Sequence, residues 1–225
     1  MCAHVNADIF RGYAVCRSVW KMKGGAIDLT WPADADTLLD APITRKRFDE
    51  DEYMPYWAQP WPAAVMLVEA ILGSEPGRNR TAVEIGCGVG LVSVAAAMKG
   101  WVVTASDYDD DALAFAKLNA ERNGVQLAGC RRIDYRQPLD QPAYDCILGA
   151  DMTYEKRACE PLARWIASAL KDQGFALVSD PNRSVSDPFV NYAQGCGLIV
   201  ETESVQSLMP DGKLSSGRIW RLTHK

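Results

Sequence analysis

The sequence predicts an α/β fold built on a mostly parallel sheet of seven strands, with helices on both faces. From Thr81 onward, short apolar runs typical of buried strands alternate with longer stretches of helical periodicity. Alternation of this kind implies right-handed crossovers, which place successive strands parallel to one another. The chain has 225 residues, which suits one domain with an elaborated end.

Seven apolar runs are expected to form the sheet. They occupy residues 82–85, 101–106, 129–133, 144–150, 175–180, 198–204 and 217–223. The helices predicted between most of them occupy residues 90–99, 109–122, 155–171 and 187–195. The last two runs are joined by LMPDGKLSS, which has turn residues and no helical pattern. We therefore expect an antiparallel pair of strands at the C-terminal end.

Another helix is expected before the sheet, in the stretch WPAAVMLVEAILG. Pro62 fits its first turn, and Gly73 fits its C-terminal stop. Residues 57–225 would form the main domain, preceded by an N-terminal extension over residues 1–56. In that extension, YAVCRSV and AIDLT are expected to be strands that cover the domain edge. The basic run at 45–47 and the acidic run at 49–52 are interpreted as a solvated loop whose charges nearly cancel.

Composition excludes several classes of function. The net charge of −5 argues against a protein that holds nucleic acid through a basic surface. The histidines are His4 and His224, at the chain ends, so a histidine metal centre or a serine–histidine triad is not expected. The seven cysteines show no CxxC spacing, which favours reduced thiols in the cytoplasm. No apolar run is long enough for a signal peptide or a membrane span.

The segment VEIGCGVG, residues 83–90, predicts a ligand-binding loop. Gly86, Gly88 and Gly90 follow a strand and precede a helix, where glycine lets the backbone turn sharply and approach a ligand. A dinucleotide fingerprint would need glycine where Leu91 stands, and a phosphate loop would need a GK[ST] ending. Glu84 precedes the loop, where a carboxylate would repel a pyrophosphate but suits an ammonium or hydroxyl group.

Acidic and aromatic residues follow the next two strands. Asp107 ends the second strand, where it is placed to accept hydrogen bonds from both ribose hydroxyls, and Tyr108 is its neighbour. After the third strand, Asp134 suits an adenine amino group and Tyr135 suits the face of the base. Together these residues describe an adenosine ligand with a zwitterionic tail and no phosphate, which is S-adenosylmethionine. Any one of the acids, taken alone, could merely cap a helix.

The same order of residues resembles the class I methyltransferases, over roughly residues 55 to 223. The fourth strand ends in GADMTY, where methyltransferases of planar amino groups usually carry N-P-P-Y. The D-x-x-Y segment from Asp151 to Tyr154, preceded by Ala150, is similar to the seven-strand protein lysine methyltransferases. The stretch PYWAQPWP most resembles their electron-transfer-flavoprotein β-subunit branch. The resemblance implies a Rossmann-like fold, S-adenosylmethionine as cofactor and a protein substrate that carries a target lysine.

The resemblance also assigns the aromatic residues of YWAQPWP. In this family the W-P segment lies beside the cofactor, which implies that Trp61 is close to it. Tyr56 and Trp57 would form walls of the channel for the lysine, since aromatic faces are rigid, apolar and attract cations. Alternatively, Trp57 and Trp61 plug the gap between the helix at 62–72 and the sheet.

Asp151 and Tyr154 are the expected catalytic residues. A lysine must lose its proton before it attacks a methyl group, and each of these side chains could accept a hydrogen bond from the amine. Asp151 could instead be the N-cap of a helix that starts near Tyr154. A small-molecule methyltransferase, a ribosomal-protein or arginine methyltransferase, and a non-catalytic cofactor-binding module remain as alternative functions.

Overall fold

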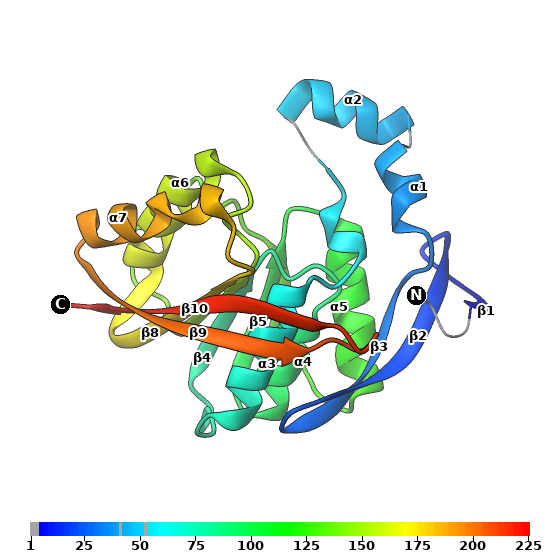
Figure 1. The fold of residues 1–225 in the computed structure, drawn as a ribbon, viewed down its shortest axis with the longest axis horizontal. Helices are drawn as coiled ribbons and strands as arrows, with labels where there is room; N and C mark the ends of the chain where they lie inside the picture. The colour runs from blue at the N-terminus through cyan, green and yellow to red at the C-terminus, as the bar shows by residue number, and fades with distance from the viewer. Residues whose placement is uncertain (1–4, 41, 52–53) are drawn as a thin grey trace.

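A seven-stranded sheet forms the centre of the molecule (Figure 1), with the strand order β6-β5-β4-β7-β8-β10-β9. The computed structural model describes residues 5–40, 42–51 and 54–225. β6, β5, β4, β7 and β8 are parallel, whereas β10 is antiparallel to both β8 and β9. The strands are β4 (Thr81–Ile85), β5 (Val102–Asp107), β6 (Gly129–Arg132), β7 (Tyr144–Ala150), β8 (Leu170–Asp180), β9 (Leu198–Leu208) and β10 (Leu214–His224). The predicted fold class, with its antiparallel C-terminal pair, is confirmed.

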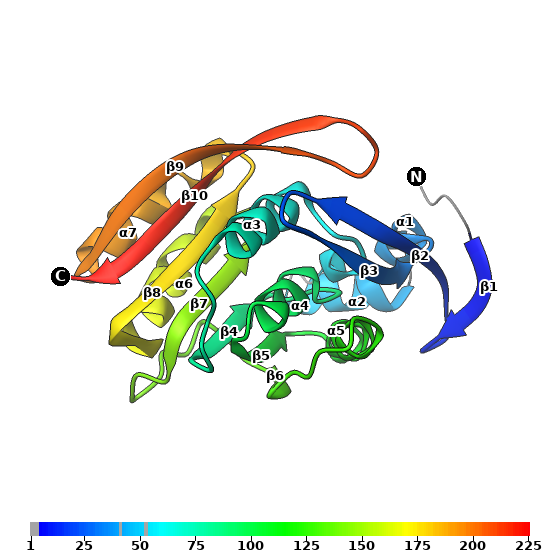
Figure 2. The ribbon, with the colours of Figure 1, turned by 90° about the horizontal axis from the view of Figure 1, so that it is seen from below.

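Helices cover both faces of the sheet, as Figure 2 shows. They are α3 (Pro62–Gly73), α4 (Leu91–Met98), α5 (Asp110–Arg122), α6 (Lys156–Ala169) and α7 (Pro188–Gly195). Alternate residues of one strand enter different cores, because successive side chains of a strand point to opposite faces. Leu148 of β7 packs with residues of α3, α4 and α5, and its neighbour Ile147 packs with residues of α6 and α7.

The N-terminal residues form a separate three-stranded antiparallel sheet with the order β1-β2-β3. Its strands are β1 (Val5–Phe10), β2 (Tyr13–Met22) and β3 (Gly25–Pro32). Asn119 of α5 and Asn123, at the C-cap of that helix, bind the backbone of β3 as another strand would. The Asn119 amide accepts from the Thr30 N–H at 2.8 Å and donates to the Thr30 carbonyl at 2.8 Å, and Asn123 does the same with Asp28 at 2.9 and 2.8 Å. Asn119 also donates to the Val89 carbonyl, which ties this sheet to the glycine loop.

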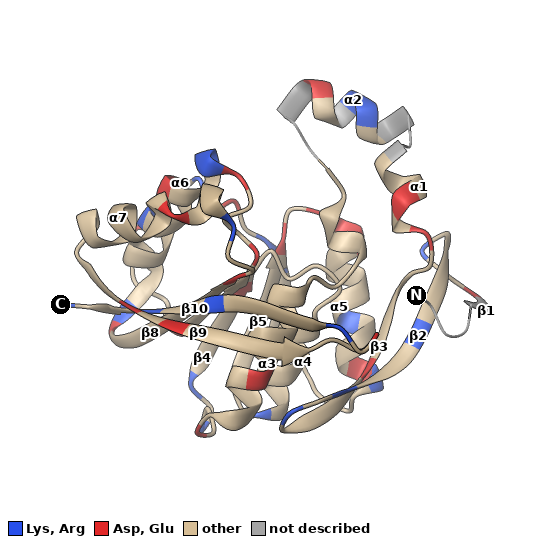
Figure 3. Ribbon diagram, viewed as in Figure 1, with Lys and Arg blue, Asp and Glu red and all other residues tan. Residues whose placement is uncertain are grey.

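Two short helices, α1 (Ala35–Asp40) and α2 (Pro42–Asp51), follow the small sheet and project away from the body (Figure 1). The charged runs at 45–47 and 49–51 lie on α2, so the prediction of a loop there was wrong. The stretch has proline only at its first position, and its opposite charges recur in the sequence at helical spacing. Figure 3 marks basic residues in blue and acidic residues in red on the described part of the ribbon. Arg45, Lys46 and Asp49 are exposed, and Glu52 lies outside the described residues.

Composition also bears on membrane-spanning helices and on the state of the cysteines. Within the described ranges, no helix has both the length and the apolar character that a membrane crossing demands. Five cysteines are free thiols: Cys87, Cys130, Cys146, Cys159 and Cys196. Cys16 is disulfide-bonded, so the prediction of reduced thiols was wrong for this residue. Cys2 and His4 lie outside the described residues.

Candidate active site

A cavity of about 720 Å³ opens at the carboxyl ends of β4, β5, β6 and β7. Parallel strands bring residues that are distant in sequence to this one edge of the sheet. All predicted site residues except Gly90 line the cavity: Tyr56, Trp57, Trp61, Glu84, Gly86, Gly88, Asp107, Tyr108, Asp134, Tyr135, Ala150, Asp151 and Tyr154. Gly90 lies at the N-cap of α4, where an added Cβ would stand 2.6 Å from the Ala116 Cα of α5. It allows two helices to approach each other.

The glycine loop passes close to two other parts of the cavity wall. Gly86 and Gly88 have φ angles of 65° and 50°, which L side chains adopt only with strain. An added Cβ on Gly86 would overlap the Met152 side chain, and one on Gly88 would lie 3.2 Å from the Trp57 carbonyl. The glycines are therefore required by the packing of the protein itself, before any ligand is considered.

Glu84 is a buried carboxyl group, only 2% exposed, and it is the penultimate residue of β4 before the loop. The Ser93 hydroxyl of α4 donates a hydrogen bond to it. Burial raises the pKa of Glu84 to about 8, and the bond from Ser93 only partly opposes this effect. A buried acid whose bonded partner is a neutral hydroxyl favours a ligand that brings a positive charge.

Asp107 joins the end of β5 to the glycine loop. Its Oδ2 accepts from the Gly88 N–H at 2.8 Å, and its Oδ1 accepts from the Asp109 N–H at 3.0 Å. Burial raises the pKa of Asp107 to about 6, against the lowering effect of these backbone bonds. The neighbouring Tyr108 is exposed, and the Arg132 guanidinium lies over its ring at 5.1 Å from the centroid.

Asp134 and Tyr135 follow β6 at the next part of the wall. Asp134 accepts from the Nε of Arg136 at 2.8 Å and from its backbone N–H at 2.9 Å. The side-chain bond from Arg136 holds the pKa of Asp134 below its ordinary value. Tyr135 packs against the apolar cluster under α6 and α7. Asp134 thus lies in the cavity wall with its charge already compensated.

The aromatic residues of the YWAQPWP segment divide into two groups. Tyr56 starts the short helix η1 (Tyr56–Ala58), and its ring contacts Tyr154 and Trp61 edge-on, with centroids 5.4 and 6.0 Å apart. Trp57 is only 8% exposed and packs against Phe115 at 5.7 Å. The Trp57 ring therefore lies mainly in the core against α5, whereas Tyr56, Trp61 and Tyr154 gather at the cavity.

Asp151 is held in an unusual backbone conformation at the end of β7. Its φ angle is 55°, and its N–H donates to the Ser179 carbonyl of β8 at 2.9 Å. Its carboxylate is paired with Arg183, whose Nε and Nη2 each donate to a different oxygen at 2.8 Å. The helix that follows begins at Lys156 with Glu155 at its N-cap, so the alternative role of Asp151 as an N-cap was wrong.

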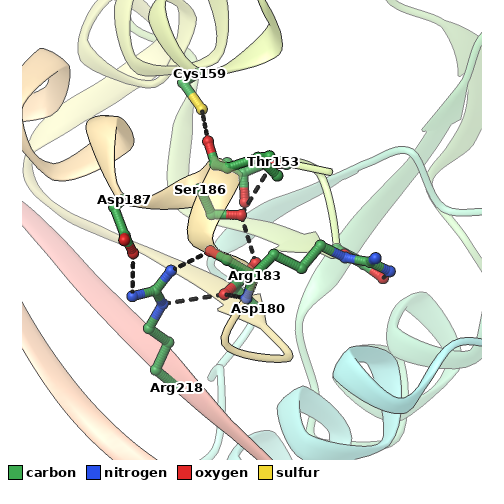
Figure 4. A network of polar contacts seen from close by, with 9 residues as sticks. Thr153, Cys159, Asp180, Arg183, Ser186, Asp187 and Arg218 are labelled. Carbon is green, nitrogen blue, oxygen red and sulfur yellow. Dashed lines mark hydrogen bonds and ion pairs between the residues drawn. The ribbon is translucent and has the colours of Figure 1, made fainter. Parts of the chain in front are cut away.

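Arg183 also lines the cavity, and it has no place among the residues predicted from the sequence. A polar network fixes the loop that carries it (Figure 4). Asp180, at the end of β8, accepts from the Arg183 N–H at 2.9 Å and from the Arg218 Nε at 3.0 Å, and Arg218 donates to the Arg183 carbonyl at 2.9 Å. The Ser186 hydroxyl, in the helix η2 (Ser184–Ser186), bonds both Asp180 and the Thr153 carbonyl, at 2.6 and 2.9 Å. The Asp151–Tyr154 segment and the Arg183 loop are therefore built as one unit.

Comparisons with known proteins place this arrangement among methyltransferases. The model of a family described as "Lysine methyltransferase" matches residues 47–193. The chain is 27% identical over 175 residues to the electron transfer flavoprotein beta subunit lysine methyltransferase of Danio rerio, covering 76% of this chain and 67% of the relative. It is 31% identical over 143 residues to a ubiquinone biosynthesis O-methyltransferase of Marinobacter nauticus, covering 60% and 55%.

A solved structure extends the likeness to the whole fold. The TehB-like SAM-dependent methyltransferase from Corynebacterium glutamicum has a TM-score of 0.55 and 18% identity, covering 86% of this chain and 99% of that one. The curated relatives are matched over about two thirds of their length or less, so the remainder of those proteins has no counterpart in the aligned part of this chain.

Proposed function

The chain belongs to the lysine methyltransferase family, and on that premise we propose that it methylates the side-chain amine of a lysine in a protein substrate. Its cofactor is S-adenosylmethionine. The observation that carries the proposal is the position of Asp151 and Tyr154. Both line the same cavity as Glu84 and the glycine loop, and Tyr154 packs against Tyr56 at the same place. An acceptor amine held there would lie beside the bound cofactor.

The polar groups of the cavity fit S-adenosylmethionine. Glu84 would hold the ammonium group of the methionine moiety, since it is buried with a neutral partner. Asp107 would accept from the ribose hydroxyls, and Asp134 from the adenine amino group. The remaining proposed contacts are the backbone of the glycine loop and the side chains or backbone of Trp61, Tyr108, Tyr135 and Ala150. The acids at the ends of β4 and β5, which have no arginine or lysine partner among the described residues, suit this ligand and would repel a phosphate group placed beside them.

The residues of the chain must then present a neutral amine in line with the methyl group. The cofactor, when bound, supplies an electrophilic methyl group on a positively charged sulfur. Deprotonating a lysine of ordinary pKa at neutral pH costs about 4 to 5 kcal/mol. The aromatic rings of Tyr56 and Tyr154 provide an apolar wall that disfavours the ammonium form. Asp151 and Tyr154 would accept hydrogen bonds from the amine and align its lone pair.

A second candidate is a small-molecule O-methyltransferase, which the match to the ubiquinone enzyme favours. The glycine loop and its acids would serve either acceptor, so they do not separate the two activities. The D-x-x-Y segment and the family match favour lysine. We place the activity in the cytosol, because five of the described cysteines are free thiols, as suits a reducing compartment, while Cys16 is disulfide-bonded.

The test uses purified protein, methyl-labelled S-adenosylmethionine and a heat-treated cell lysate, so that lysate methyltransferases are inactive. We expect a labelled protein band that yields methyllysine after hydrolysis, and mass spectrometry of the band would identify the site. An Asp151→Asn protein serves as a control for the dependence of labelling on this cavity. Label found only in small extractable molecules would overturn the proposal in favour of the second candidate.

A further inference from the structure

Asp151 carries its own counter-ion. Its side chain is 6% exposed, and the Arg183 guanidinium, 39% exposed, binds both carboxylate oxygens at 2.8 Å. A bidentate pair of this kind offsets most of the carboxylate charge. Each carboxylate oxygen nevertheless has room for a second hydrogen bond. Asp151 therefore remains an acceptor, but no longer acts as an isolated negative charge.

This distinction matters for a lysine nucleophile. An isolated carboxylate beside the amine would favour the ammonium form, which has no lone pair to attack a methyl group. An opposite charge within about 4 to 6 Å shifts a pKa by about 1 to 3 pH units toward the charged form. A bare Asp151 would therefore bind the lysine more firmly in the form that cannot react.

We propose that Arg183 is a positioning residue that offsets the charge of Asp151, so that the cavity accepts the lysine as a neutral amine. The inference rests on the proposed function and deepens it. One site would both orient the amine and avoid raising the pKa of the lysine, so that the ammonium form is not favoured. Arg183 acts through Asp151 and does not need to touch the reacting atoms.

The surrounding structure keeps the guanidinium in place. The N–H and the carbonyl of Arg183 are both bonded, to Asp180 and Arg218 respectively (Figure 4). Asp180 is fully buried and is itself paired with Arg218, so it does not compete with Asp151 for the Arg183 side chain. Asp151 also raises the pKa of Arg183 above its ordinary value, which keeps the guanidinium charged throughout an assay in water.

Three other acids near the pair have partners of their own. Glu155 is paired with Arg157, Asp187 with Arg218, and Asp134 with Arg136. Burial raises the pKa of Tyr154, which keeps its hydroxyl neutral in the useful range. The remaining titratable groups that face the cavity or the pair are Tyr56 of η1, Glu84 of β4, Cys87 of the glycine loop, Asp107 of β5, Tyr108 after β5 and Tyr135 after β6. They are the same in every variant below, so differences between variants report on Asp151 and Arg183.

The experiment is the pH dependence of single-turnover methylation of the labelled protein band at saturating cofactor. For Arg183→Met, we expect the midpoint of the rate profile to rise by about 1 to 3 pH units. The rate at pH 7.5 should fall by roughly 10- to 1,000-fold and recover at high pH, since each pH unit is a factor of ten. Arg183→Gln also removes the charge but keeps a hydrogen-bond donor, so we expect the same rise of the midpoint. This variant replaces Arg183→Met in the test if the methionine protein does not fold.

Two further variants separate charge from structure. Arg183→Lys keeps the positive charge, so its midpoint should stay near that of wild type even if its maximal rate is lower. The double variant Asp151→Asn/Arg183→Met has neither charge, and its midpoint should return toward wild type. A melting curve for each protein confirms that it is folded under the assay conditions.

The possible outcomes are distinct. If Arg183→Met and Arg183→Gln lower the rate by the same factor at every pH, Arg183 has only a structural role and the inference is overturned. If the wild-type protein labels no protein band, the proposed function fails and this inference fails with it. A labelled band whose midpoint is unmoved by the loss of Arg183 leaves the proposed function intact and overturns the inference alone.

Discussion

The two sides of the cavity satisfy their carboxylates differently. On the loop side, which comprises Glu84, Gly86, Gly88 and Asp107, the acids accept from a hydroxyl and from backbone N–H groups. On the acceptor side, which comprises Asp151, Tyr154 and Arg183, the acid is bound by a guanidinium. Burial accordingly raises the pKa values on the loop side to about 8 for Glu84 and about 6 for Asp107.

The difference indicates which ligand charge each side expects. A buried acid without a protein cation is stabilised by a ligand that brings one, and the sulfonium cofactor carries an ammonium group. An acid whose charge is already offset suits a nucleophile that must arrive neutral. We infer that the loop side determines cofactor affinity, and the acceptor side determines the rate at saturating cofactor.

The largest effect should come from Gly86→Val, because an added Cβ there would overlap Met152, the residue after Asp151 of the acceptor side. The φ angle of 65° costs a side chain about 1 to 2 kcal/mol, and the overlap with Met152 adds about 1 to 3 kcal/mol. We expect the free energy of unfolding, measured by denaturant titration, to fall by about 2 to 5 kcal/mol. Displacement of Met152 should also disturb Asp151, so both affinity and rate should fall.

Gly124→Val is the matched control for that change. Gly124 has a φ of 66°, and an added Cβ there would meet nothing within 4 Å. The free energy of unfolding of Gly124→Val should fall only by the cost of the positive φ angle, about 1 to 2 kcal/mol, and cofactor affinity should not change. If the two valine variants behave alike in stability and in calorimetric affinity, the close approach between Gly86 and Met152 has no functional weight.

The next effect is the pH dependence of stability caused by Glu84. Its ordinary pKa of 4.5 rises to about 8 in the folded protein, so between these values the unfolded chain releases a proton that the folded one keeps. Stability is therefore highest below about pH 4.5 for this group and is lost as pH rises through about 8, by a few kcal/mol. Melting temperatures of cofactor-free protein, compared with Glu84→Gln, measure the contribution.

The Glu84→Gln protein should have a flatter profile between those pH values, with the remaining slope due partly to Asp107. Added S-adenosylmethionine should raise the wild-type melting temperature more at pH 8 than it raises that of the variant. Parallel pH profiles for the two proteins would show that Glu84 is ionised in the folded state at lower pH, which would contradict the account of the loop side.

The loop side was predictable because its signals are local in sequence. Glycines at fixed spacing after a strand, and acids at the ends of the next strands, can be recognised without knowing what packs against them. The order of strands and helices in the main sheet follows from the same alternation. α2 was missed because its composition is typical of a solvated loop, and only its proline position and charge spacing distinguish it.

The acceptor side was only half predictable. The D-x-x-Y segment identified Asp151 and Tyr154, but the partner of Asp151 stands 32 residues later, beyond the next strand. Nothing in the local pattern of PNRS marks Arg183 as a cavity residue. β7 and β8 are parallel neighbours, so their carboxyl ends lie together. Only this pairing, which the sequence does not reveal, indicates that a charged residue after β8 can reach Asp151.

A smaller effect, confined to the acceptor side, is expected from Asp151→Asn. Asparagine tolerates the left-handed backbone at this position and keeps the shape of the side chain, so the fold should survive. It is a weaker acceptor for the amine, and misalignment of a nucleophile costs on the order of a hundredfold in rate. Single-turnover methylation at saturating cofactor measures the loss, and cofactor affinity should stay near wild type.

Asp145→Asn is the control for Asp151→Asn, since Asp145 lies near the other end of β7 and pairs with Lys171 at 3.1 Å. It removes a paired carboxylate from β7, the strand that Asp151 follows, at a position outside the cavity lining, and its methylation rate should be close to wild type. A folded Asp151→Asn enzyme with an unchanged rate would remove Asp151 from the catalytic machinery.

The smallest effect should distinguish two acids that face the cofactor. Asp107 offers a half-buried carboxylate with neutral partners, so Asp107→Ala should weaken cofactor binding by about 1.5 to 3 kcal/mol. Asp134 is already bonded by Arg136, and its bond to a neutral adenine amino group should contribute only about 0.5 to 1.5 kcal/mol. Calorimetric titration of both variants gives the ranking.

Neither variant should lower the rate at saturating cofactor, because neither acid approaches the amine. An equal loss of affinity for the two would mean that Arg136 does not compensate Asp134 when the cofactor is bound. A reduced rate at saturation in either would mean that the two sides of the cavity are coupled.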